Sequence, residues 1–202
     1  MEYQIPASEI VVEEEIKKSR FITYLRHTEG LEQAKAFWQQ MRELHPTARH
    51  HCWAAVAMQP TNSQSLGFSD DGEPAGTAGK PMLNCLLGSG IGEISAVVVR
   101  YYGGILLGTG GLVRAYAGGV QQALKQLPTT LKIERKMYQL DCDYAQLNDV
   151  QHLLNDYNAL IINQDFQQTI RIEFAITENQ AIDFQQRLRL RSAGQLQIKE
   201  KN

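Results

Sequence analysis

The order of apolar and polar positions predicts a buried strand in the middle of the chain and a helix after it. Residues 96–99 form an apolar run rich in β-branched side chains, which is typical of a strand covered on both faces. Apolar residues then recur at helical spacing over residues 112–126, and Pro128 ends that helix. Glycine-rich turns at residues 103–104 and 108–111 separate the two elements.

The same periodicities predict the elements that precede this centre. Alternating or β-branched runs indicate strands, and amphipathic spacing indicates helices. They predict strands over residues 9–15, 20–27 and 51–58, and helices over residues 31–44 and about 79–87. Residues 59–79 show neither pattern, so we expect a long loop there, of a length that often carries function.

Beyond Pro128 the composition changes, because glycine nearly vanishes and Gln, Asn, Asp and Leu dominate. The patterns predict strand 131–142, helix 144–155, strands 159–166 and 169–176, helix 181–191 and strand 194–199. This βαββαβ order is that of ferredoxin-like folds. We therefore predict an α+β protein with two domains, residues 1–128 and residues 129–202, of which the second is ferredoxin-like.

Composition limits the possible functions. The 202 residues are 43% hydrophobic and carry a net charge of −2, so only a local basic patch could contact nucleic acid. No apolar run is long enough to cross a bilayer, and residues 1–4 lack the features of a signal peptide. Three scattered cysteines fit a reducing compartment. We expect a cytoplasmic monomer with no membrane contact, no metal and no cofactor.

Positive charge concentrates around the glycine turns. No Asp or Glu occurs between Ile94 and Ile133, whereas Arg100 and Arg114 flank the turns. Free N–H groups at a helix start attract anions, and glycine lets a bulky anion approach the backbone. We predict that both arginines converge on an anion or phosphate-backbone site, with a tight turn beside two solvated arginines as the alternative. The candidate binding residues are Lys80, Arg100, Tyr101, Gly103, Gly104, Gly108, Gly110, Gly111 and Arg114.

Three tyrosines accompany these residues. Tyr101 and Tyr102 follow the central strand, and Tyr116 lies in the predicted helix. Aromatic rings of this kind stack on unpaired bases in proteins that bind single strands. Tyr116 falls on the apolar face of the helix, which favours a core position for it.

A cluster of acids in the long loop allows several interpretations. Asp70, Asp71 and Glu73 could hold Mg²⁺ or, with a histidine, perform acid–base catalysis. Their spacing matches no familiar metal motif, and residues 70–74 also have the composition of a tight turn. A third interpretation is that the acids orient the nearby cations. The residues of this supporting loop would be Asp70, Asp71, Glu73, Arg49 and His51.

Three segments resemble the signature of a known family. They are residues 69–81, residues 99–108 and residues 110–116. Together they resemble the IMPACT family, and the two-domain layout resembles its bacterial YigZ-like branch, which lacks an RWD domain. The resemblance implies a first domain like domain 2 of ribosomal protein S5 and a second like a ferredoxin-like domain of elongation factor G. Eukaryotic members of the family regulate translation.

These observations favour a binding or regulatory protein of translation. We expect it to contact RNA, the ribosome or a translation-factor protein through the glycine-rich basic face of the first domain. One alternative is an enzyme, such as a metal-dependent hydrolase, that uses Asp70, Asp71, Glu73 and a histidine on a small molecule or peptide. The other is a module that binds only proteins. We expect no catalytic residues under the leading interpretation.

Overall fold

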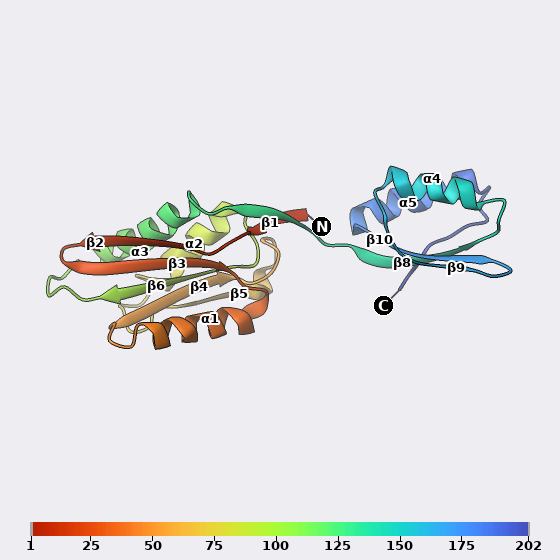
Figure 1. The fold of residues 1–202 in the computed structure, drawn as a ribbon. Coiled ribbons are helices and arrows are strands. Elements are labelled where there is room, and N and C mark those ends of the chain that lie inside the picture. Colours follow the sequence, from red (N-terminus) through yellow and green to blue (C-terminus); the bar gives the residue numbers. More distant parts are fainter. Residues whose placement is uncertain (1, 202) are drawn as a thin grey trace. The chain divides into compact units, whose positions relative to one another are not determined.

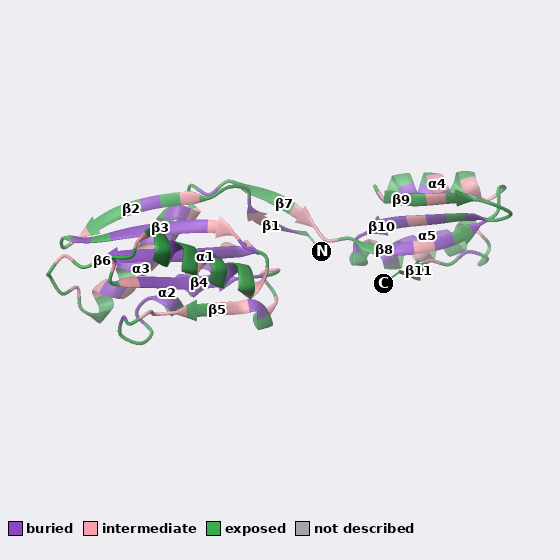
Figure 2. Cartoon of the chain, turned by 60° about the horizontal axis from the view of Figure 1, so that its bottom comes forward, coloured by how far each residue is buried: buried purple, intermediate pink, exposed green. Residues whose placement is uncertain are grey.

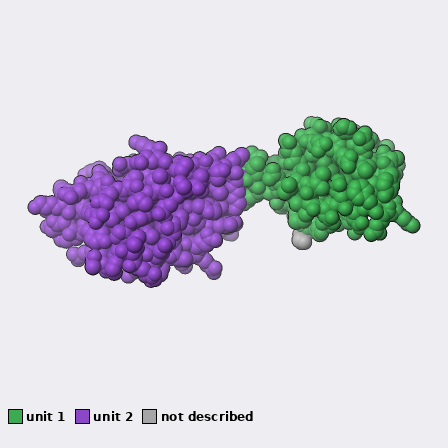
Figure 3. Space-filling model, viewed as in Figure 1, with its two compact units in different colours: residues 1–2, 133–202 green, residues 3–132 purple. Residues whose placement is uncertain are grey.

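The computed structural model describes residues 2–201 and confirms the α+β class (Figure 1). Residues 3–132 form one compact unit, which we call the larger unit. Residue 2 and residues 133–201 form the smaller unit (Figure 3). Among the described residues, no helix combines the length and the apolar character that a bilayer crossing requires.

The larger unit contains a five-stranded antiparallel sheet with strand order β2-β3-β6-β4-β5. The strands are β2 (Ile10–Ile16), β3 (Ser19–His27), β4 (His50–Val56), β5 (Leu66–Ser69) and β6 (Ile94–Tyr101). One face is covered by α1 (Gly30–Leu44), and the other by α2 (Gly79–Ser89) and α3 (Thr109–Leu124). The predicted buried central strand is therefore confirmed as β6.

Alternation along β6 divides the core into two layers. Val97 and Val99 pack with the apolar side of α1, whereas Ala96 and Val98 pack with α2 and α3. Every residue from Ile94 to Arg100 is buried, as Figure 2 shows for the centre of the sheet. Covering on both faces explains why this strand is a continuous apolar run and does not alternate with polar residues.

The smaller unit has the predicted ferredoxin-like topology. Its elements are β8 (Lys136–Cys142), α4 (Leu147–Asp156), β9 (Leu160–Phe166), β10 (Ile170–Ile176), α5 (Glu178–Arg191) and β11 (Lys199–Glu200). The antiparallel sheet has the order β11-β8-β10-β9, and both helices pack on one face of it. Thr177 and Gln180 form a reciprocal capping box that begins α5.

Three predicted elements differ from the structure. β5 lies inside the predicted loop of residues 59–79. Its four residues are too few to show the alternation of apolar and polar side chains by which a strand is predicted. The predicted strand 131–142 is two strands, β7 (Thr129–Ile133) and β8, in different sheets. The predicted strand 194–199 is replaced by the two residues of β11.

The buried carboxylate of Glu93 forms hydrogen bonds with residues from both ends of the larger unit. β1 (Glu2–Pro6) pairs with β7, and Glu93 receives a side chain from each of them. The Tyr3 hydroxyl donates to Glu93 Oε1 at 2.7 Å, and Lys132 Nζ donates to the same oxygen. His27 Nε2 lies 2.7 Å from Oε2. Burial alone would raise the pKa of Glu93, but the hydrogen bonds from Lys132, His27 and Tyr3 outweigh it and hold the pKa below its usual value.

Two adjacent glycines in α3 lead to a matched stability prediction. A Cβ on Gly118 would meet nothing within 4 Å, whereas a Cβ on Gly119 would lie 2.4 Å from Thr23 Oγ1 in the buried sheet. We expect Gly118→Ala to stabilise the protein by about 1 kcal/mol through helix propensity. We expect Gly119→Ala to destabilise it by about 1–2 kcal/mol through overpacking. Urea denaturation of both variants measures the difference, and equal midpoints would contradict the close approach of α3 to β3.

Candidate anion-binding site

One end of the larger unit collects exposed positive charge. At this end β4 begins, β6 ends, and α2 and α3 both start. Exposed cations surround it, and we call this surface the basic end. Its members are Lys17, Lys18, Arg49, Lys80 and Arg114. Within residues 2–201, none of these five side chains takes part in an ion pair. Their charge is therefore available to an external anion.

A cavity of about 380 Å³ opens at the basic end where β6 gives way to α3. We call it the α3 cavity. Its polar lining includes Arg49, His50, Glu73, Arg100, Tyr102 and Thr109. Leucine side chains of the loop after β6 and of α3 supply the apolar part. The cavity thus combines cations, an aromatic ring and a helix start in one concave surface.

Arg100 is buried at the back of this cavity. Its side chain is 6% exposed, and Nη1 donates to Glu73 Oε1 at 2.5 Å. Nη2 lies 3.4 Å from Ser19 Oγ, and the guanidinium lies between the rings of Phe21 and Tyr102. Among the described residues its buried Nε has no hydrogen-bond partner. Arg100 is therefore an internal cation whose hydrogen-bonding capacity is only partly used.

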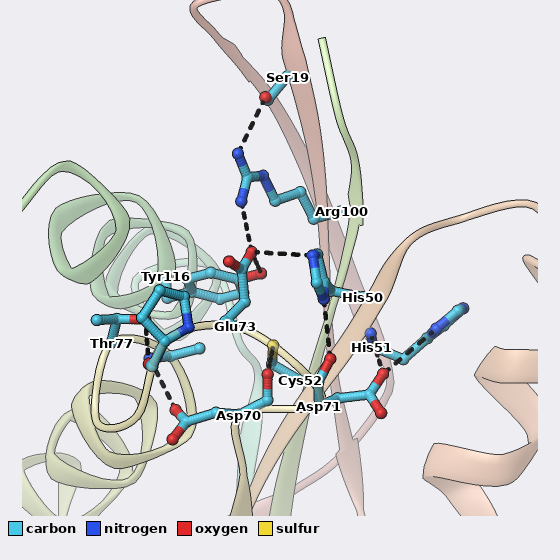
Figure 4. A network of polar contacts seen from close by, with 12 residues as sticks. Ser19, His50, His51, Cys52, Asp70, Asp71, Glu73, Thr77, Arg100 and Tyr116 are labelled. Carbon is cyan, nitrogen blue, oxygen red and sulfur yellow. Dashed lines mark hydrogen bonds and ion pairs between the residues drawn. The ribbon is translucent and has the colours of Figure 1, made fainter. Parts of the chain in front are cut away.

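Glu73 is the centre of a buried network (Figure 4). Besides Arg100, its Oε1 accepts a hydrogen bond from the Tyr116 hydroxyl at 2.8 Å, and His50 Nε2 lies 3.9 Å away. Tyr116 is fully buried, which confirms its predicted core position, and this burial raises the pKa of its hydroxyl. One carboxylate thus links β6, α3 and the start of β4, and the Glu73–Arg100 contact agrees with the interpretation that the acids orient nearby cations.

The neighbouring aspartates have structural partners. Asp71 and Gly72 both have positive φ, and Glu73 N–H donates to the Asp70 carbonyl at 2.9 Å, so residues 70–73 form the predicted turn. The Asp70 carboxylate accepts from the N–H groups of Gly76, Ala78 and Gly79 at 2.8–3.0 Å and so caps α2. Asp71 accepts from His51 N–H and Arg42. Within residues 2–201 no three His, Cys, Asp or Glu side chains are grouped as a metal site would need.

The start of α3 differs from that of α2. Gly108 precedes the helix with a φ of 74°, and among the described residues no side chain caps this end. The first N–H groups of a helix have no acceptor within it. Gly108 and Thr109 line the α3 cavity, so the first residue of the helix lies at its wall.

Some predicted site residues lie elsewhere. Arg114 borders a groove between β2 and α3 with Lys17 and Glu14, whereas Arg100 lines the α3 cavity, so the two arginines do not line the same cavity. Leu107 lines both the groove and the α3 cavity. Tyr101 belongs to the opposite face of the sheet, because successive strand residues alternate, and its hydroxyl bonds to His45.

The other predicted residues shape the basic end. Gly103 N–H donates to Ser19 Oγ at 3.2 Å, and Gly104 takes a left-handed φ of 83°. Gly110 and Gly111 lie in the first turn of α3. Buried His51 has a lowered pKa because of desolvation, and its ring contacts the His45 carbonyl.

Sequence reasoning assigned no site role to Ser19 or Thr109. Ser19 contacts Arg100 across 81 residues of sequence, and no local pattern indicates such a contact. Buried Cys52 has a raised pKa because of desolvation, and its thiol donates to the Asp70 carbonyl. The network therefore holds this cysteine as a thiol, which is a poor nucleophile.

Comparison with known proteins gives consistent matches. Residues 17–124 match the Impact N-terminal domain, and residues 140–195 match a domain of unknown function, DUF1949. The chain is 62% identical to an IMPACT family member of Haemophilus influenzae, over 98% of this chain and 96% of that protein. It is 58% identical to the IMPACT family member YigZ of Escherichia coli, over 96% and 95% of the two chains. A crystal structure of a hypothetical protein is 56% identical, covers 100% of this chain and 98% of its own, and superposes with a TM-score of 0.70.

Proposed function

This chain belongs to the IMPACT family, and from that premise we propose that it is a cytoplasmic regulatory protein of translation that binds RNA on the ribosome. The RNA backbone would lie across the basic end of the larger unit. Phosphate contacts made by exposed lysine and arginine supply affinity without reading sequence.

The observation that carries this proposal is the unpaired charge of the basic end. Its five exposed cations have no ion pairs within residues 2–201, whereas Arg20, Arg42 and Arg100 nearby are each paired with an acid. Glycines at residues 103–104 and 108 keep the backbone between these cations accessible. The whole chain has a net charge of −2, so it does not attract a polyanion by its overall charge. The attraction would come from the local concentration of positive charge at the basic end.

The enzyme alternative has less support from the geometry. The Asp70 carboxylate accepts three backbone N–H groups, and the Glu73 carboxylate accepts from Arg100 and Tyr116. These contacts occupy both oxygen atoms of Asp70 and the Oε1 atom of Glu73. The carboxylates therefore act as supports for the basic end, and we do not assign them a catalytic step.

The test is co-sedimentation of the protein with ribosomes at a series of salt concentrations, with and without nuclease. We expect Arg49→Ala/Arg114→Ala to weaken binding and to reduce the slope of log affinity against log salt by about 1.5–2, which corresponds to two phosphate contacts. The matched control is Arg135→Ala/Arg189→Ala, which removes two exposed arginines of the smaller unit that also have no ion pair in the described structure.

The outcomes separate the alternatives. Binding that needs intact RNA, falls with salt and is lost only in the first double variant supports the proposal. Partner capture that survives both nuclease and moderate salt would favour a module that binds proteins. Absence of co-sedimentation at every salt concentration would contradict ribosome binding.

A further inference from the structure

We propose that the α3 cavity binds a nucleoside monophosphate group, with the phosphate at the start of α3 and the base against Tyr102. The ligand is either a free nucleotide or the phosphorylated end of an RNA chain. This inference rests on the proposed function, because it names what one part of the basic end recognises.

The wall of the cavity offers unused donors to a phosphate. The uncapped start of α3 presents its first residue, Thr109, there. The Arg100 guanidinium lines the back of the cavity, and its Nε, which has no partner among the described residues, is enclosed behind it. Arg49 is exposed at the rim. By contrast, the start of α2 is already filled by the Asp70 carboxylate, an anion from the protein itself. Within the described part of the chain, the start of α3 therefore has no carboxylate bound to its N–H groups, and the Glu73 carboxylate that also lines the cavity is paired with Arg100.

The charge of the cavity suits a terminal phosphate. Arg100 and Glu73 form a buried ion pair and largely cancel, so Arg49 leaves about one net positive charge. A helix start adds about half a charge more. A phosphate monoester carries about −1.5 to −2 at neutral pH. A phosphodiester within a strand carries one negative charge, so the end of a chain or a free nucleotide matches the cavity better than the middle of a strand.

The remainder of the cavity suits a base. Tyr102 is 40% exposed, and its ring lies 5.7 Å from the Arg49 guanidinium carbon and 5.6 Å from that of Arg100. These two cations hold the ring at the cavity wall, where its exposed part can stack on a base. Leu106 and Leu112 provide apolar surface beside it. A cavity of about 380 Å³ is at the small end of ligand sites, which fits one nucleotide.

Calorimetric titration with three defined probes tests the proposal. They are a 5′-phosphorylated RNA pentanucleotide, the same RNA with a 5′-hydroxyl, and adenosine 5′-monophosphate. We expect the phosphorylated RNA to bind about tenfold more tightly than the hydroxyl form, because charge-assisted bonds are the strong ones. If adenosine monophosphate displaces the phosphorylated RNA, a single nucleotide is enough for binding. If the phosphorylated RNA binds tightly and adenosine monophosphate does not displace it, the ligand is the end of an RNA chain.

Variants of the protein separate the two parts of the ligand. We expect Tyr102→Ala to weaken binding of phosphorylated RNA about tenfold through loss of stacking, and Tyr102→Phe to retain it. We expect Arg49→Ala to reduce the preference for the phosphorylated end. Tyr144→Ala and Arg189→Ala are the matched controls, because both side chains are exposed in the smaller unit.

Equal affinity for the two RNA ends, or no binding of any probe, would overturn the proposal. The comparison of RNA ends uses the unaltered protein, so it stands even if a variant fails to fold. Equal affinity together with intact ribosome co-sedimentation would refute this inference and leave the proposed function in place. Tight nucleotide binding without co-sedimentation would refute the proposed function and leave the nucleotide site.

Discussion

Replacing Glu73 by alanine should destabilise the protein by about 3–5 kcal/mol, because it leaves a buried guanidinium without its counter-ion. The Glu73 and Arg100 side chains are 4% and 6% exposed, so the pair is almost fully removed from solvent in the native protein. Tyr116 loses its acceptor in the same change. Urea denaturation followed by circular dichroism measures the loss as a fall in the free energy of unfolding.

A double-mutant cycle shows whether the effect belongs to the ion pair. We expect Glu73→Leu/Arg100→Met to be far less destabilised than the sum of the single changes, because an apolar pair needs no charge compensation. The surface control is Glu13→Ala, which breaks the half-exposed ion pair with Arg20 and should cost far less than the Glu73 change, because water screens the pair. Strict additivity of the Glu73 and Arg100 changes would contradict the pairing.

Alanine at Gly103 should cost about 3 kcal/mol for a different reason, which is lack of space. A Cβ at this position would lie 2.0 Å from the carbonyl carbon and oxygen of Lys18, and backbone cannot move aside as a flexible side chain can. The loop after β6 would have to leave the β2–β3 turn and give up the bond from Gly103 N–H to Ser19. Denaturant unfolding measures this loss, and hydrogen exchange at residue 19 reports whether the loop has moved.

The next residue is the control for Gly103. Gly104 has open space around it but a φ of 83°, so Gly104→Ala is strained only by its backbone conformation. We expect about 1–2 kcal/mol for that variant. If Gly103→Ala were no worse than Gly104→Ala, the close contact between the loop and the β2–β3 turn would be wrong.

Periodicity in the sequence is enough to locate most of the fold. The apolar run that becomes β6 and the amphipathic pattern of α3 are local properties of the chain, and both were predictable. The βαββαβ order of the smaller unit was predictable for the same reason. The pairing of β7 with β1 was not, because it joins the two ends of the larger unit and leaves no local pattern.

The candidate site was harder to predict than the fold. The sequence reveals that Arg100 is a cation at a strand end, and a cation there suggests an exposed contact. It does not reveal that Glu73, 27 residues earlier, occupies the same buried place. It also does not reveal that Arg100 and Arg114 line different cavities. Burial and pairing of charges are therefore the features that required the three-dimensional structure.

The contacts of Glu93 bring the two chain ends of the larger unit close together. Tyr3 and Lys132 are the first and last residues of that unit, and both donate to one carboxylate oxygen. A short peptide could therefore join these two positions without crossing the sheet, and new termini could be opened in the exposed segment near residue 60. The larger unit is for this reason suited to circular permutation, with its basic end left intact.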